Sequence, residues 1–305
     1  MIGDAAEQSA IEQQERPGAR TTPFIQRIPV HGWVGLAINL LAWTCSWTQF
    51  KPFSAYTFFP LWFGFILVLD GLNVARTGTS PLTRSVPRFI AMFLISAPLW
   101  WAFEALNIPV QNWHYVFDRP YSAIAYFLIS SLDFSTVLPG VMEMAELLAS
   151  VPALRPRLSP TDPGGKLSIP AAAALFGVGL VTVVLPTLFP RYAYGLIWLS
   201  LIFLLDPINN LFRRKSTFGH LLRGDWRFIL TVPLAAISCG FFWEMWNYLA
   251  LPKWYYTVPF FDAWPHLFEM PVPGYLGYLP FALEVFAMYQ FVLLLTGGWK
   301  DNLVI

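Results

Sequence analysis

Charged residues are scarce in this chain of 305 residues. They make up 12% of the sequence, about half of the roughly 25% that is usual in soluble domains, whereas hydrophobic residues make up 56%. This composition excludes both a soluble globular domain and a disordered chain. Cysteine is rare as well: Cys45 and Cys239 both lie within apolar segments, which leaves no disulfide framework and no Cys-x-x-Cys metal site.

The motifs of several functional classes are also missing. The sequence contains no Gly-x-x-x-x-Gly-Lys-Ser/Thr phosphate loop, no Gly-x-Gly-x-x-Gly dinucleotide fingerprint and no Gly-x-Ser-x-Gly nucleophile motif. The 4 histidines show no His-x-x-x-His spacing that would favour a metal. We therefore expect no nucleotide, no redox cofactor and no metal: the predicted cofactor is none.

Long apolar segments are abundant instead. A membrane-spanning helix needs about 20 largely apolar residues, and eight segments fit: 33–50, 54–75, 89–107, 136–154, 169–189, 193–212, 228–250 and 276–297. A further segment, 121–133, is apolar but too short to span if 136–154 does; whether it is interfacial, re-entrant or spanning stays open. The sequence predicts an all-α, polytopic membrane protein of about eight transmembrane helices.

The positions of the basic residues predict an orientation. With eight spans, the N-terminal tail, the even-numbered loops and the C-terminus share one side, which holds all but four of the 19 Lys and Arg residues. Basic residues mark the cytoplasmic side. We therefore expect a multi-pass protein of the cell (inner) membrane with both termini in the cytoplasm. Residues 1–31 are polar and lack the pattern of a signal peptide, so they are predicted to form a flexible cytoplasmic tail.

Four short patterns occur twice in the same order, at an offset that grows from 136 residues (Asp70 to Asp206) to 141 (Glu143 to Glu284). The pairs are Trp62…Leu69-Asp70-x-x-Asn73 with Trp198…Leu205-Asp206-x-x-Asn209, Glu104-x-x-Asn107 with Glu244-x-x-Asn247, Trp113-x-Tyr115 with Trp254-x-Tyr256, and Leu138-Pro139-x-x-x-Glu143 with Leu279-Pro280-x-x-x-Glu284. This pattern predicts two parallel four-helix repeats, 32–154 and 169–298, joined by a cytoplasmic linker, 155–168.

The duplicated patterns place six acidic residues inside predicted spans. An acidic side chain there costs roughly 2.5–3.5 kcal/mol on insertion scales, so its presence suggests a function. The direction of the spans predicts that Glu104, Glu143, Glu244 and Glu284 lie in one layer of the outer leaflet. Asp70 and Asp206 lie near the cytoplasmic ends, where helix ends or arginines can satisfy them. The alternative is that all six only bond helices together.

Amides and aromatic residues accompany the predicted layer of glutamates. Asn107 and Asn247 each follow a glutamate by three residues and therefore share its helix face. The aromatic candidates for a binding site are Trp101, Trp113, Tyr115, Trp243, Trp254 and Tyr256. Each is accounted for by ordinary packing or by the aromatic belt of a membrane protein, but together they would also line a cavity for a flat apolar ligand.

The run Phe242-Trp243-Glu244, the later Trp254-x-Tyr256 and the motif Pro280-x-x-x-Glu284-x-Phe286 resemble the membrane-embedded lycopene cyclase domain of carotenoid biosynthesis. The similarity covers residues 241–286 and, more faintly, 101–143. That domain occurs in pairs, as two chains or one fused chain. The resemblance implies a membrane enzyme of the isomerase or lyase class that cyclises a polyene.

The leading hypothesis is therefore a cofactor-independent isoprenoid or carotenoid cyclase. Glu143 and Glu284 would act as acid and base on a carbon–carbon double bond, with Glu104 and Glu244 tuning their acidity. The predicted partners are an apolar isoprenoid-like ligand or lipid and the lipid bilayer, with no nucleic acid. Two alternatives stay open: a proton-coupled small-molecule transporter and a non-catalytic membrane scaffold protein.

Overall fold

The computed structural model describes residues 23–297 and 301–305. Most of the predicted flexible tail, residues 1–22, lies outside the described residues. The end of that segment is helical, contrary to the prediction of a flexible tail up to residue 31. A short 3-10 helix, η1 (Phe24–Arg27), precedes helix α2, which begins at Val30.

Seven helical segments in the described part of the chain are long and apolar enough to cross a membrane, as expected for a multi-pass membrane protein. They are α3 (Phe58–Thr77), α5 (Val86–Val110), α6 with α7 (Ala123–Phe134 and Val137–Ala149), α8 (Ile169–Leu188), α9 with α10 (Pro190–Ala193 and Ile197–Leu211), α12 (Trp226–Tyr248), and η4 with α13 (Val272–Gly277 and Tyr278–Leu295).

The first predicted span, 33–50, corresponds to α2 (Val30–Trp47), which is not among these seven. Its polar residues include His31 and Asn39. It nevertheless packs along the whole of α3, because glycines let the two backbones approach closely. A Cβ atom built on Gly64 would lie 2.6 Å from the Gly35 carbonyl oxygen. The amide of Asn39 adds a hydrogen bond of 2.9 Å to the Leu61 carbonyl.

Residues 121–133, for which the sequence left the alternatives open, belong to a longer helical segment. Helices α6 and α7 form one candidate span, Ala123–Ala149, that is interrupted at Ser135 and Thr136. Ser96 of α5 bridges the interruption, donating to the Phe134 carbonyl (2.6 Å) and accepting from the Leu138 N–H (3.0 Å). Backbone groups in a membrane need such partners, so the break is tolerated and the span starts well before residue 136.

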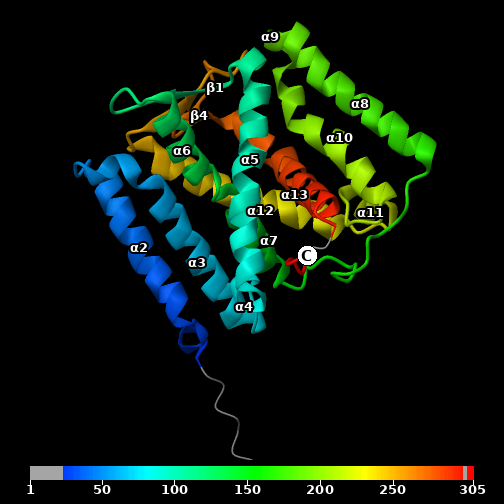
Figure 1. Ribbon diagram of the computed structural model, residues 1–305, viewed down its shortest axis with the longest axis horizontal. Coiled ribbons are helices and arrows are strands. Elements are labelled where there is room, and N and C mark those ends of the chain that lie inside the picture. The colour runs from blue at the N-terminus through cyan, green and yellow to red at the C-terminus, as the bar shows by residue number, and fades with distance from the viewer. Residues whose placement is uncertain (1–22, 298–300) are drawn as a thin grey trace, which may run out of the picture.

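The two ends of the helical body differ (Figure 1). At one end, β1 (Trp113–Val116) pairs antiparallel with β2 (Lys253–Tyr256), beside the short strands β3 (His266–Leu267) and β4 (Met270–Pro271). The opposite end carries α4 (Pro81–Arg84) and the C-terminus, together with α11 (Thr217–Leu222), which follows α10. We call these the ribbon end and the basic end.

Helix contacts repeat between the two halves. In the first half α2 packs on α3 and α3 on α7, and in the second half α8 packs on α10 and α10 on α13. Helix α12 contacts both α7 and α13, which places it at the junction of the halves. Large apolar side chains such as Trp62, Phe228 and Phe281 fill the core around this junction.

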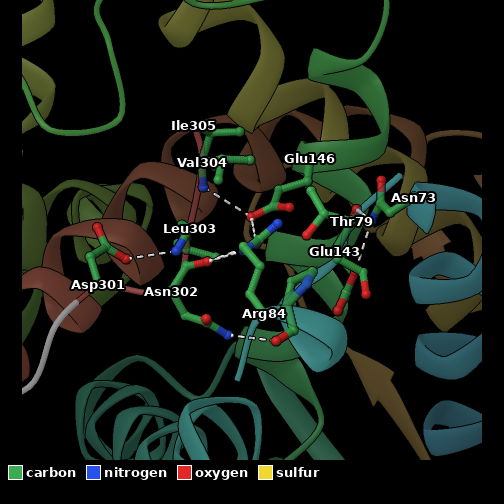
Figure 2. A network of polar contacts seen from close by, with 12 residues as sticks. Asn73, Thr79, Arg84, Glu143, Glu146, Asp301, Asn302, Leu303, Val304 and Ile305 are labelled. Carbon is green, nitrogen blue, oxygen red and sulfur yellow. Dashed lines mark hydrogen bonds and ion pairs between the residues drawn. The ribbon is translucent and has the colours of Figure 1, made fainter. Parts of the chain in front are cut away.

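Residues 301–305, the C-terminal strap, tie the halves together at the basic end (Figure 2). From the first half, Arg84 donates to the Asn302 carbonyl (2.7 Å), and Glu146 accepts from the Val304 N–H (3.1 Å). From the second half, the ammonium of Lys215 donates to the Ile305 carbonyl (2.9 Å). The Leu303 and Ile305 side chains are buried in the core.

Candidate functional site

A cavity of about 180 Å³ lies below the β1–β2 ribbon, between the two halves. One water needs only ~10–15 Å³ of such space, so this cavity has room for a larger ligand. Fifteen of its 31 lining residues are aromatic. Those that the argument uses are Trp100, Trp113, Trp198, Trp243, Trp254 and Phe281.

Glu104 stands behind one wall of this cavity. A single carboxylate oxygen, Oε1, accepts from Trp100 Nε1 (2.9 Å), Trp113 Nε1 (3.0 Å) and the Tyr115 hydroxyl (2.5 Å). All three donors also line the cavity. Partial burial of Tyr115 and its negative neighbour Glu104 raise the pKa of Tyr115 well above its usual value, so the hydroxyl stays a donor.

Glu244 has the corresponding place behind the opposite wall and is fully buried. Its Oε1 atom accepts from the hydroxyls of Tyr256 (2.6 Å) and Tyr278 (2.9 Å), and Trp254 Nε1 donates to the Tyr256 oxygen (2.8 Å). Partial burial and Glu244 raise the pKa of Tyr256 well above its usual value. The second oxygen of Glu244, Oε2, is buried without a hydrogen-bond partner among the described residues.

Asn107 and Asn247 fasten the ribbon to its helices. The Asn107 amide donates to the Trp113 carbonyl (2.9 Å) at the start of β1, and the Asn247 amide donates to the Trp254 carbonyl (2.7 Å) in β2. Both were predicted to bind substrate. Asn247 does line the cavity, but Asn107 does not. Their shared contacts make them positioning residues for the two Trp-x-Tyr strands.

Of the predicted aromatic candidates, Trp101 is the one that does not line the cavity. Its indole donates to Ser131 (2.9 Å) and stacks on Phe127, so it joins α5 to α6. The other five line the cavity; they are Trp113, Tyr115, Trp243, Trp254 and Tyr256. Ribbon register explains this gathering, because Trp113 pairs with Tyr256 and Tyr115 with Trp254.

The four glutamates do not form one layer, contrary to the prediction. Glu143 bonds to the Asn73 amide (2.8 Å), near the basic end of α3. Glu284 accepts from the Leu201 N–H (2.7 Å), in the second turn of α10 near the ribbon end. The reason is that the span containing Glu143 starts at Ala123 rather than at residue 136. Neither Glu143 nor Glu284 lines the cavity.

The helix contacts align the two halves of the chain differently from the repeated sequence patterns. Asn73 donates to the Glu143 carbonyl (3.0 Å), whereas Asn209 donates to the Ala287 carbonyl (2.8 Å). By these contacts Glu143 corresponds to Ala287 and not to Glu284. The repeated Leu-Pro-x-x-x-Glu pattern therefore pairs two glutamates that have different surroundings.

Sequence reasoning missed Asp133, which is the acidic residue that lines the cavity. It lies near the end of α6, two residues before the break in the span at Ser135 and Thr136. The sequence feature that could have identified Asp133 is an acidic residue inside the apolar segment 121–133. That segment was interpreted as too short to span, so its acid was not counted with the buried ones.

No protein-family model, no curated protein and no solved structure matches this chain. Among residues 23–297 and 301–305, no group of three or more His, Cys, Asp and Glu side chains is arranged to hold a metal ion. What the site can do chemically follows from its aromatic walls, its one lining carboxyl and the two carboxylates behind those walls.

Proposed function

We propose that this chain is a cofactor-independent membrane enzyme that adds a proton to a carbon–carbon double bond of an apolar, isoprenoid-like ligand. The observation that carries the proposal is the aromatic cavity with Asp133 at its wall and with Glu104 and Glu244 directly behind its walls. The resemblance of residues 241–286 to the lycopene cyclase domain supports the same class of reaction.

The aromatic walls suit a cationic intermediate. Ring faces attract a cation, and the attraction reaches about 2 kcal/mol or more when water is excluded. Trp100, Trp113 and Trp243 line the cavity, and most of its lining surface is apolar. A carbocation formed inside would lie against these rings.

Asp133 is the proposed proton donor, because its carboxyl lines the cavity. Protonation of one double bond gives a carbocation, which a second double bond attacks to close a ring. A neighbouring carbon then loses a proton, which passes to Glu244 while the hydroxyl of Tyr256 or Tyr278 relays it. One proton is added and one is lost, so the reaction is an isomerisation. This assignment replaces Glu143 and Glu284 as acid and base.

We also propose that the two halves of the chain arose by tandem duplication. Asp70 accepts from the Leu82 N–H and Asp206 from the Phe218 N–H, at the same offset of 136 residues. In the ribbon, His114 pairs with Tyr255 at the centre of a register that is symmetric under the offset of 141. A two-fold axis along the membrane normal would relate the halves, with the basic end in the cytoplasm.

The test is expression of the chain in a strain that accumulates lycopene or another linear polyene. We expect a ring-ended product, and D133N should lower its rate by at least ~100-fold, the usual contribution of a general acid. D162N is the matched control, because Asp162 lies in the 155–168 linker at the basic end and outside the cavity. Unchanged pigment in cells that contain the folded protein would contradict the proposal.

The same cavity distinguishes the enzyme from the transporter alternative. A transporter needs an aqueous pathway to its site, whereas the enzyme needs a cavity sealed from water. Replacing Ser130, which lines the cavity, with cysteine in a C45S/C239S background provides the probe. We expect no reaction with a membrane-impermeant thiol reagent, and rapid labelling would favour transport.

A further inference from the structure

A second group of buried acids lies at the basic end of the first half, away from the cavity. Glu143 on α7 and Asp70 on α3 are both fully buried where these two helices pack together. The amide of Asn73, one turn from Asp70, donates to Glu143 Oε2 (2.8 Å), and Figure 2 shows this contact. Two carboxyls buried on either side of one amide inside a membrane favour a proton on one of them.

The polar atoms left over at this site indicate where that proton sits. Glu143 Oε1 and Asn73 Oδ1 are buried and have no hydrogen-bond partner in the part of the chain that the structure describes. Buried polar atoms are rarely left unpaired. A proton on Glu143 Oε1, donated to Asp70, gives the Glu143 oxygen its missing bond.

His31 connects this pair to the surroundings of the protein. Its Nε2 atom lies 2.8 Å from Asp70 Oδ1, and its side chain is 25% exposed, whereas that of Asp70 is 0% exposed. The other oxygen of Asp70 accepts from the Leu82 N–H (2.9 Å). His31 lies in the first turn of α2, at the basic end. The three side chains therefore lead from the surface towards a buried carboxyl.

The neighbouring acid and base on this side of the first half are bonded to one another. Glu146, one turn after Glu143, is already bonded to Arg84 (2.6 Å) and to the strap N–H of Val304. Arg84 itself is held by the Asn302 carbonyl (Figure 2). From α12 the nearest contact is the Cys239 thiol, which donates to the Gly140 carbonyl. His31 is a basic group that contacts the pair directly.

The second half supplies an internal comparison. Both oxygens of Asp206 are satisfied by the N–H groups of Thr217 (2.8 Å) and Phe218 (2.9 Å). Asn209 donates to the carbonyl of Ala287, which stands where the first half has Glu143. A helix pair of this kind therefore packs without the glutamate, so packing does not require Glu143.

We propose that His31, Asp70 and Glu143 form a proton-binding relay that passes a proton between the surface at the basic end and the buried carboxyl of Glu143. Its ligand is the proton alone. The relay is separate from the ligand cavity, because none of its three residues lines that cavity. This proposal does not depend on whether the cavity converts a polyene.

Infrared spectroscopy of the full chain in lipid discs, with no ligand added, tests the proposal. The wild-type spectrum minus that of E143Q should contain the carbonyl band of one protonated carboxyl. D70N should shift this band, because it replaces the group that accepts the proton. D206N, the matched control, should leave it unchanged. The proposal would be overturned if the difference spectrum between the wild type and E143Q contained no band of a protonated carboxyl, or if D70N did not shift that band.

Exchange in heavy water separates a relay from a static hydrogen bond. H31Q keeps Glu143 and Asp70 in place and changes a partly exposed side chain, so it tests the path even if E143Q does not fold. We expect the Glu143 band to shift in heavy water at least ten-fold more slowly in H31Q than in the wild type. Equal exchange rates, or a wild-type band that never exchanges, would show that the three residues do not pass a proton.

Discussion

The glycine contact between α2 and α3 is the feature that brings the more polar α2 into the helical body, and G64A tests it. A Cβ atom at residue 64 would lie 2.6 Å from the Gly35 carbonyl oxygen and 2.7 Å from the Asn39 nitrogen. Ordinary contacts begin at 3.4 Å, so one of the helices must move by about 0.8 Å. Both neighbouring atoms belong to the backbone, which cannot rotate away.

Overpacking of this kind costs about 1–3 kcal/mol. Exchanging glycine for alanine in a helix also stabilises the helix by roughly 0.5–1 kcal/mol, which would hide part of the cost. G177A is therefore the matched control: Gly177 lies within α8, and a Cβ atom there meets nothing within 4 Å. The difference in the free energy of unfolding between the two variants cancels the helix propensity of alanine and leaves the cost of the close contact between α2 and α3.

The assay is equilibrium unfolding in mixed micelles with increasing SDS, followed by tryptophan fluorescence. We expect G177A to be at least as stable as the wild type and G64A to be about 1–3 kcal/mol less stable than G177A. If the two variants unfold within about 0.5 kcal/mol of each other, α2 does not pack on α3 through these glycines.

Two further predictions concern the basic end. K215M should lower the free energy of unfolding by about 3 kcal/mol, because a hydrogen bond to a charged group contributes ~1.5–3 kcal/mol. The substitution removes three contacts of the Lys215 ammonium to the strap, to Asp301 (3.0 Å), Leu303 (3.1 Å) and Ile305 (2.9 Å). An unchanged free energy of unfolding would contradict this prediction. Burial lowers the pKa of His220, so below about pH 6.5 the unfolded chain binds a proton that the folded chain does not. Stability should fall as the pH drops through this range and level off below the folded pKa, whereas H220Q should show a weaker dependence.

Much of the fold follows from local patterns in the sequence. Apolar segments predicted the helices, and the paired Asp and Asn residues predicted matched contacts, since Asp206 and Asp70 do bond to N–H groups of the short helices α11 and α4. The helices and these contacts were predictable because each depends on residues that lie close together in the chain. The strands were not predicted: an all-α protein was expected, yet the two Trp-x-Tyr pairs lie in β1 and β2.

The depth of the acids was not predictable in this way. The interruption at Ser135 is tolerated only because Ser96, about forty residues earlier, bonds to both of its sides, and no local signal reports that contact. Without it, the span appeared to start after Asp133, and Glu143 appeared to lie in the outer leaflet. Likewise, the match of Glu143 to Ala287 depends on helix packing and not on spacing.

The central claim, that the cavity adds a proton to an unsaturated ligand, is tested most directly in heavy water. Purified protein is incubated with a linear polyene in D₂O, and the product is analysed by mass spectrometry. The account predicts one deuterium for each ring closed in the wild type, with almost no product from D133N. Ring-ended product without deuterium, or no conversion by folded protein that has bound the polyene, would contradict it.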